Sequence, residues 1–145
     1  MSDEVTQEML RKINDLEERV RRLSSERALF PIWNVNTPAQ ITSNQNNYDP
    51  GDYAALLLQS DINGRQITGF QGGVAGRLLL LVNISSTTIV LVNSSASSDS
   101  ANQILIPGAA NLTMQANPTG NATTVLLGWG LRNVDGWRLL FRSVP

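Results

Sequence analysis

The segment over residues 46–52 holds the densest set of side chains in the sequence that could take part in catalysis or bind a metal ion. Two carboxylates, Asp49 and Asp52, flank Pro50 and Gly51, and a pair of carboxylates is what the acid–base hydrolysis of a glycan uses. The same oxygens, with the two asparagine amides before them, are of the kind that bind Ca²⁺. However, the segment lacks the glycine and the terminal glutamate of an EF-hand loop, and Pro-Gly between Asp residues is typical of a turn with Asx caps. We therefore interpret it as a structural turn, with the calcium loop as the alternative.

The sequence contains no histidine and no cysteine. Histidine is the commonest general base and metal ligand, and cysteine supplies thiolate nucleophiles, zinc ligands and disulfides. Carboxylate or tyrosine chemistry remains, and no second set of groups that would support Asp49 and Asp52 is evident. The sequence therefore predicts a protein that is not an enzyme and that uses no cofactor and no metal.

Aromatic side chains are the other group with binding chemistry, because their rings pack on apolar and sugar faces. Trp129 lies between Gly128 and Gly130, a setting that favours an exposed ring or one at a contact between subunits. Trp137 precedes a run of apolar residues and is expected in the core. We single out Trp129 and Tyr48 as ligand or interface aromatics, with burial in a sheet as the alternative.

Residues 1–30 predict a long α-helix that presents a surface for self-association. The segment has neither Gly nor Pro, its start is acidic, its end is rich in arginine, and Pro31 follows it. Its apolar positions alternate spacings of four and three residues, which is the heptad of a coiled coil. The predicted oligomerisation residues are Met9, Ile13, Leu16, Val20, Leu23, Arg27 and Phe30 along the seam, with Lys12 and Glu17 beside it.

The heptad leaves dimer and trimer open. β-Branched residues at position a with Leu at position d favour two helices. Against this, residues 12–17 resemble a short trimerisation motif, with Lys12 where that motif prefers Arg. A helix packed on its own head is a third arrangement, but a narrow apolar stripe with a charged surround favours another copy of the same helix.

Residues 31–145 predict a separate, β-rich head domain. Glu26 is the last glutamate and Lys12 the only lysine, while Asn, Ser, Thr and Gly become common. Short apolar runs alternate with turn-forming clusters, which indicates a mainly β fold: an antiparallel β-sandwich or a jelly-roll-like barrel. Strands are expected over residues 39–42, 53–59, 66–70, 77–83, 87–93, 103–107, 111–115, 123–128 and 136–142.

The clearest predicted hairpin joins residues 78–83 to residues 88–93 through residues 84–87. Both arms are nearly continuous in apolar residues. Strands of this kind are usually covered on both faces. We therefore expect the hairpin to be central, with a neighbouring subunit as one candidate cover.

Charge and hydropathy exclude two classes of partner. The net charge is -1, and Asp and Arg balance each other in the head, so no concentrated basic face invites nucleic acid or a membrane surface. The longest apolar runs, residues 78–82 and 89–92, are too short to span a bilayer. No targeting segment is visible, so we expect a protein made in a cytoplasm, with no nucleic-acid partner and no membrane insertion.

An ordered series of short motifs runs through residues 39–142. In this order they resemble the β-domains of fibre, spike and decoration proteins of tailed bacteriophages, which assemble as trimers. That pattern often has Arg after the position of Asn102, where this chain has Gln103. The resemblance therefore implies no basic contact at Gln103. The motifs are Gln40-Ile41-Thr42, Asn47-Tyr48-Asp49-Pro50-Gly51, Ile67-Thr68-Gly69-Phe70, Gly73–Arg77 leading into Leu78–Asn83, Ser98–Gln103, Asn111-Leu112-Thr113 and Asp135-Gly136-Trp137-Arg138.

The resemblance implies a homotrimer at the virion surface that contacts the major capsid protein or another virion protein. A tail fibre or tailspike normally adds a tail-docking domain, and here about thirty residues precede the head. The expected function is therefore that of a head fibre or capsid decoration protein. The alternative is a receptor-binding tail-fibre or tailspike module that recognises host surface glycans.

Overall fold

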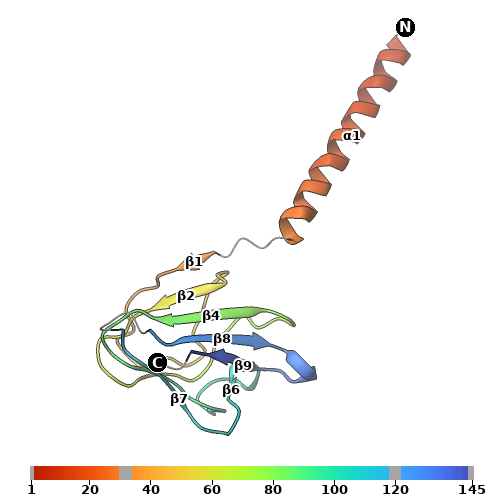
Figure 1. Cartoon of the computed structure of the whole chain (residues 1–145). Coiled ribbons are helices and arrows are strands. Elements are labelled where there is room, and N and C mark those ends of the chain that lie inside the picture. Colours follow the sequence, from red (N-terminus) through yellow and green to blue (C-terminus); the bar gives the residue numbers. More distant parts are fainter. Residues whose placement is uncertain (1, 30–33, 118–121, 144–145) are drawn as a thin grey trace. The chain divides into compact units, whose positions relative to one another are not determined.

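The computed structural model describes residues 2–29, 34–117 and 122–143, and the chain divides into two units, Met1–Trp33 and Asn34–Pro145. The first unit contains the helix α1 (Ser2–Leu29), which confirms the predicted helix (Figure 1). Asp3 and Glu4 occupy its first turn, where carboxylates complement the positive end of the helix dipole. At 1.5 Å per residue, α1 is about 40 Å long.

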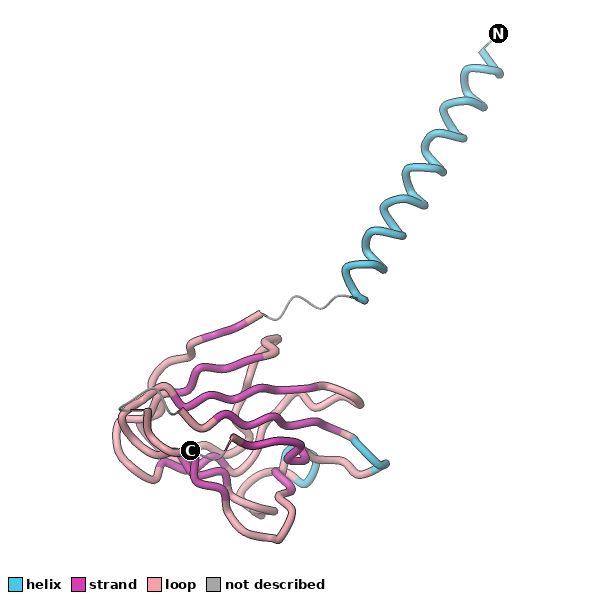
Figure 2. Tube along the Cα trace, in the orientation of Figure 1, coloured by secondary structure: helices cyan, strands magenta, loops and turns pink. Residues whose placement is uncertain are grey.

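The second unit contains two β-sheets (Figures 1 and 2). The larger sheet has six strands in the order β1-β2-β4-β8-β9-β6, and the smaller has three in the order β3-β5-β7. Two short 3₁₀ turns, η1 (Ser100–Asn102) and η2 (Leu131–Asn133), lie between strands. The strands are β1 (Val35–Asn36), β2 (Ala55–Leu58), β3 (Arg65–Ile67), β4 (Leu78–Asn83), β5 (Ile89–Leu91), β6 (Ile104–Leu105), β7 (Leu112–Met114), β8 (Thr124–Trp129) and β9 (Trp137–Arg142).

Every strand predicted from residue 53 onward is present, whereas the first prediction, residues 39–42, forms only an isolated bridge from Ile41 to Ser60. No pattern in the sequence predicted β1, which spans two residues.

The prediction of an antiparallel fold was wrong, because the pairing is mixed. The pairs β1–β2, β2–β4, β3–β5 and β6–β9 are parallel, and the pairs β4–β8, β5–β7 and β8–β9 are antiparallel. The barrel alternative is wrong as well: the described strands form open sheets, and β1 and β6 are the two edges of the larger one. From β2 to β8, successive strands alternate between the two sheets.

The predicted hairpin of β4 and β5 does not form, because these strands belong to different sheets. The buried side chain of Asn83 explains the change of direction. Its Nδ2 donates to the carbonyls of Thr87, Met114 and Gln115 at 2.7, 3.1 and 3.1 Å, and its Oδ1 accepts from the backbone N–H of Ser85 at 3.1 Å. These bonds hold residues 83–87 as a corner that carries the chain from one sheet to the other.

A single hydrophobic cluster joins the two sheets. The larger sheet contributes alternate residues such as Leu79 and Leu81 of β4, and the smaller sheet contributes Ile89 and Leu91 of β5, all fully buried. Burying one such side chain contributes about 1.5–3 kcal/mol. Trp137 is also fully buried, which confirms its predicted place in the core, and its indole N–H donates to the carbonyl of Phe70 at 2.8 Å.

Candidate oligomerisation surface

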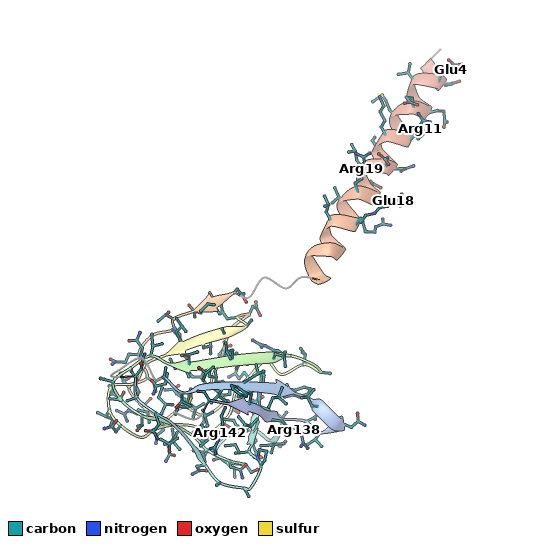
Figure 3. The ribbon with its side chains drawn as sticks, viewed as in Figure 1. Glu4, Arg11, Glu18, Arg19, Arg138 and Arg142 are labelled. Atoms are coloured by element: carbon teal, nitrogen blue, oxygen red, sulfur yellow. The ribbon has the colours of Figure 1, made fainter. Side chains whose placement is uncertain are left out.

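The apolar heptad positions of α1 form an exposed stripe. Met9, Ile13, Leu16, Val20 and Leu23 expose between 48% and 62% of their surface. Side chains project from α1 on all sides, Glu4, Arg11, Glu18 and Arg19 among them (Figure 3). A helix of this kind gains little from its own side chains, because most helical stability in proteins comes from packing an apolar face. The stripe is therefore an apolar surface that nothing covers within the described helix.

Two further residues extend the stripe, and sequence reasoning did not include them. Val5 lies four residues before Met9, and Leu10 lies three before Ile13, and both are exposed. Their spacing was the signal that could have found them. With Val5, the apolar row begins near the first turn of α1 and follows nearly its whole described length.

The charged residues beside the stripe are free to meet a neighbour. The Nζ of Lys12 lies 3.9 Å from an oxygen of Glu8, and both side chains are largely exposed, so this ion pair contributes little. Glu17 is exposed on the next turn. Arg27 lies in α1, but its side chain falls outside the described residues, as does Phe30 entirely, so both remain predictions from the heptad.

Trp129 and Tyr48 lie in the head and pack partly against the hydrophobic cluster. The indole N–H of Trp129 donates to the carbonyl of Ala101 at 2.7 Å. One side of the indole lies against Gly73, where a side chain would collide with the ring. Tyr48 meets the ring of Phe70 edge-on at 5.9 Å, and burial, followed by the nearby Asp49 carboxylate, raises the pKa of its phenol. Both rings thus pack partly within the head, and a ligand or subunit contact at either ring stays a prediction.

The segment over residues 46–52 is a turn, as its sequence indicates. Oδ1 of Asp49 accepts the backbone N–H of Gly51 at 2.9 Å, and Gly51 has a φ of 62°, a left-handed conformation that glycine adopts without strain. The carbonyl of Asp52 accepts from the Asn34 amide at 2.9 Å, which fastens the turn beside β1. Within the described ranges, no cluster of three or more acidic side chains has an arrangement that could hold a metal ion.

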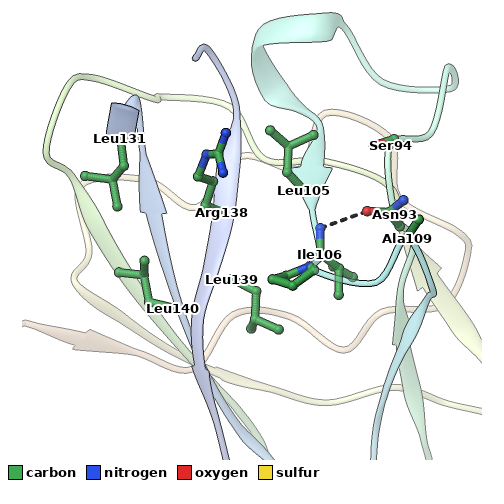
Figure 4. A pocket seen from close by; sticks show the side chains of 10 residues that line it. Asn93, Ser94, Leu105, Ile106, Ala109, Leu131, Arg138, Leu139 and Leu140 are labelled. Atoms are coloured by element: carbon green, nitrogen blue, oxygen red, sulfur yellow. Dashed lines mark hydrogen bonds between the residues drawn. The ribbon is translucent and has the colours of Figure 1, made fainter. Parts of the chain in front are cut away.

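A groove of about 500 Å³ lies along the edge formed by β9 and β6, and sequence reasoning missed it. Leu105, Leu131 and Leu140 supply apolar walls, and Figure 4 shows Arg138 between Leu105 and Leu131. The Nε of Arg138 is buried and has no hydrogen-bond partner among the described atoms. On one side, Oδ1 of Asn93 accepts the N–H of Ile106 at 2.8 Å. Apolar walls with one guanidinium suit binding rather than catalysis.

Comparisons with known proteins return no match: no family model, no curated protein and no solved structure is similar to this chain. α1 is too polar to cross a membrane, and the described residues contain no other helix with the length and hydropathy to do so. The functional argument therefore depends on the sequence and on the geometry of the two units.

Proposed function

We propose that this chain is a non-enzymatic structural protein of a tailed-phage virion, a homotrimeric head fibre or capsid decoration protein. In this proposal α1 forms a coiled-coil stalk and the two sheets of the head form a β-sandwich. The observation that carries it is the exposed heptad stripe of α1, which needs an apolar partner and repeats at the spacing that another α1 would match.

The head supports this proposal because its loops are fixed by side-chain hydrogen bonds. The side-chain oxygen of Asn47 accepts from the N–H of Asp99 and from the amide of Asn102, both at 2.9 Å. Ser98 joins this network through the backbone N–H of Asn47 at 2.9 Å and through the hydroxyl of Thr68 at 2.7 Å. Loops held in this way lose little conformational entropy when the protein assembles, as suits a virion component.

The order of motifs along the head supports the location at the virion surface and a contact with the major capsid protein or another virion protein. The stalk sets the number of copies, and the head reinforces or decorates the shell.

The first test is the mass of the full chain in solution, measured by light scattering on a sizing column. We expect three times the mass of one chain. Leu16→Lys places a charge in the seam and should shift the protein toward smaller species, because a buried unpaired ammonium costs several kcal/mol. Asn14→Lys puts the same charge on another side of α1 and should leave the mass unchanged. A monomeric unaltered chain would contradict the proposal.

The second test locates the protein on particles. Capsids purified without tails should still carry it, as detected by quantitative mass spectrometry, and particles assembled without it should lose stability. Recovery only with purified tails would contradict the capsid assignment and favour the receptor-binding alternative.

A further inference from the structure

The outer face of the six-stranded sheet, the face turned away from the hydrophobic cluster, is mainly apolar from the edge strand β1 to β9. Strand register aligns one residue from each of five strands in a row across it. Phe141 and Val35, at the two ends of this row, are 57% and 53% exposed. The row is Val35, Ala55, Leu80, Leu126 and Phe141.

Neighbouring rows extend this outer apolar face. On one side, Leu57 and Val82 lie next to each other on β2 and β4. On the other side, Leu78 of β4 lies opposite Gly128 of β8. A side chain on Gly128 would meet the ends of Leu131, Leu140 and Leu78, so these three leucines converge over the glycine. Leu140 and Leu78 are 46% and 41% exposed.

Such a face is unusual for a sheet that borders water. Sheets with one solvated face normally alternate apolar residues inward and polar residues outward. The three-stranded sheet follows this rule more closely, because its outer row is Gln66, Val90 and Thr113. The six-stranded sheet does not follow it, and a contiguous apolar patch on a folded domain marks a contact surface.

We infer that this outer apolar face is covered by a second copy of the head, so that the six-stranded sheets of the three subunits pack together around the three-fold axis. The inference rests on the proposed function, since it concerns the same trimer, and it adds a second contact to that of α1.

The composition of the face favours a permanent contact between copies over a transient partner. Arg138 is the charged residue in these rows. Permanent homo-oligomeric contacts resemble a domain core, whereas transient contacts are about as polar as the remaining surface. An identical chain also offers an equally apolar face as soon as it folds.

The length of chain between the two units supports the same occupant. Residues 30–34 separate the end of α1 from Val35 of β1, the edge strand of this sheet. A fully extended chain of that length spans about 20 Å. Association of three α1 helices would therefore keep the three sheets at high effective concentration, so that even a modest contact between the heads forms.

The stripe of α1 from the same chain would cover the outer apolar face less well than a second copy of the head would. The face extends across five strands, whereas the stripe is narrow and is flanked by Lys12, Glu17 and Arg19. Packing the helix against the sheet would remove these charges from water against leucine and valine, at a cost of several kcal/mol. Three α1 helices leave the same charges at the solvated edge of their seam.

A matched pair of cysteines tests the inference on the full chain. The protein has no cysteine, so Val82→Cys in β4 and Val90→Cys in β5 each introduce a single thiol. Both valines are partly buried within one copy and belong to the outer faces of different sheets. We expect Cys at position 82 to react with a thiol reagent at least tenfold more slowly than Cys at position 90, and at an equal rate after unfolding.

A crosslink identifies what covers the face. Phe141→p-benzoylphenylalanine places a photoreactive ring of related shape at an exposed position of the row. Irradiation should join two copies of the chain, with the bond mapped by mass spectrometry to residues 55–57, 78–82, 124–128 or 137–142. A bond to residues 2–29 would overturn the inference, because it would place a helix on the face.

The outcomes separate the inference from the proposed function. A trimer in which the two cysteines react at equal rates overturns the inference and leaves the trimer intact. A monomer in which position 82 is protected overturns both, since the cover then comes from the same chain. A monomer in which positions 82 and 90 react at equal rates also overturns the inference and the proposed function.

Discussion

The outer faces of the two sheets differ although their central strands have similar sequences. Residues 78–82 in β4 and residues 89–92, which include β5, are both nearly continuous apolar runs. In β5, Val90 lies between Gln66 and Thr113, whereas in β4, Leu80 lies between Ala55 and Leu126. The neighbours that the register supplies, and not the strand's own sequence, therefore decide whether the outer face around an apolar strand is polar or apolar.

The largest expected effect comes from comparing the two sides of β4. Leu81→Ala removes a fully buried side chain and should lower the free energy of unfolding by about 2–5 kcal/mol. Leu80→Ala, on the outer apolar face, should cost less than half as much per chain and should instead weaken the trimer. Urea unfolding at two protein concentrations measures both quantities. Equal losses for the two variants, with no dependence on concentration, would show that the outer face is not a contact.

A smaller effect is expected at the corner that separates the two strands. Asn83→Ala leaves three carbonyls without the Asn83 amide and should lower the free energy of unfolding by about 1–3 kcal/mol. The matched control is Asn63→Ala, because the exposed Asn63 accepts one bond, from the N–H of Thr88 at 2.9 Å. Thermal unfolding of both variants checks this. A loss at Asn83 no greater than that at Asn63 would mean that the corner does not hold the sheets together.

The smallest effect concerns the rim of the three-stranded sheet. Arg65, which begins β3, donates to both oxygens of Asp61 at 2.6 and 2.8 Å and holds the pKa of that carboxyl below its ordinary value. The ion pair therefore stabilises the fold above the ordinary carboxyl pKa, and its contribution is lost as the pH falls through the lowered pKa. Asp61→Asn should flatten the acid dependence of the unfolding midpoint.

The same acid titration gives a control within one experiment. The unaltered chain and Asp61→Asn should have the same mass at each pH, because the rows of the outer apolar face contain no carboxylate and Asp61 lies outside them. A mass that changes with pH in the unaltered chain but not in Asp61→Asn would place this ion pair, and with it the three-stranded sheet, at the subunit contact.

Local features of the sequence predicted local structure well. Residues 2–29 form a helix because good helix formers continue without Gly or Pro, and most strands coincide with apolar runs between turn residues. The turn at Asp49 and the burial of Trp137 were also visible from their neighbours. These features depend on residues within a few positions of each other.

The pairing of strands was not predictable in the same way. A four-residue connection after Asn83 suggested a hairpin, yet the hydrogen bonds that turn the chain toward the other sheet come from Met114 and Gln115, some thirty positions away. The outer apolar face was invisible for the same reason, since Val35, Leu80 and Phe141 become neighbours only through parallel and antiparallel register. The groove around Arg138 likewise depends on β6 and β9 lying side by side.

The alternation of strands between the sheets sets the kinetics of folding. Because β2 to β8 enter the two sheets in turn, no two successive strands within this span pair with each other; among the described strands, the pairs β1–β2 and β8–β9 at the ends of the series do join neighbours in the chain. Each pairing must first close a loop, and that entropy is lost before any contact compensates for it. Domains dominated by such non-local pairings fold in milliseconds to seconds, about a thousandfold or more slower than helical proteins of similar size. The hydrogen bonds of α1 join residues four positions apart, so this helix begins to form before the distant strands of the head have paired.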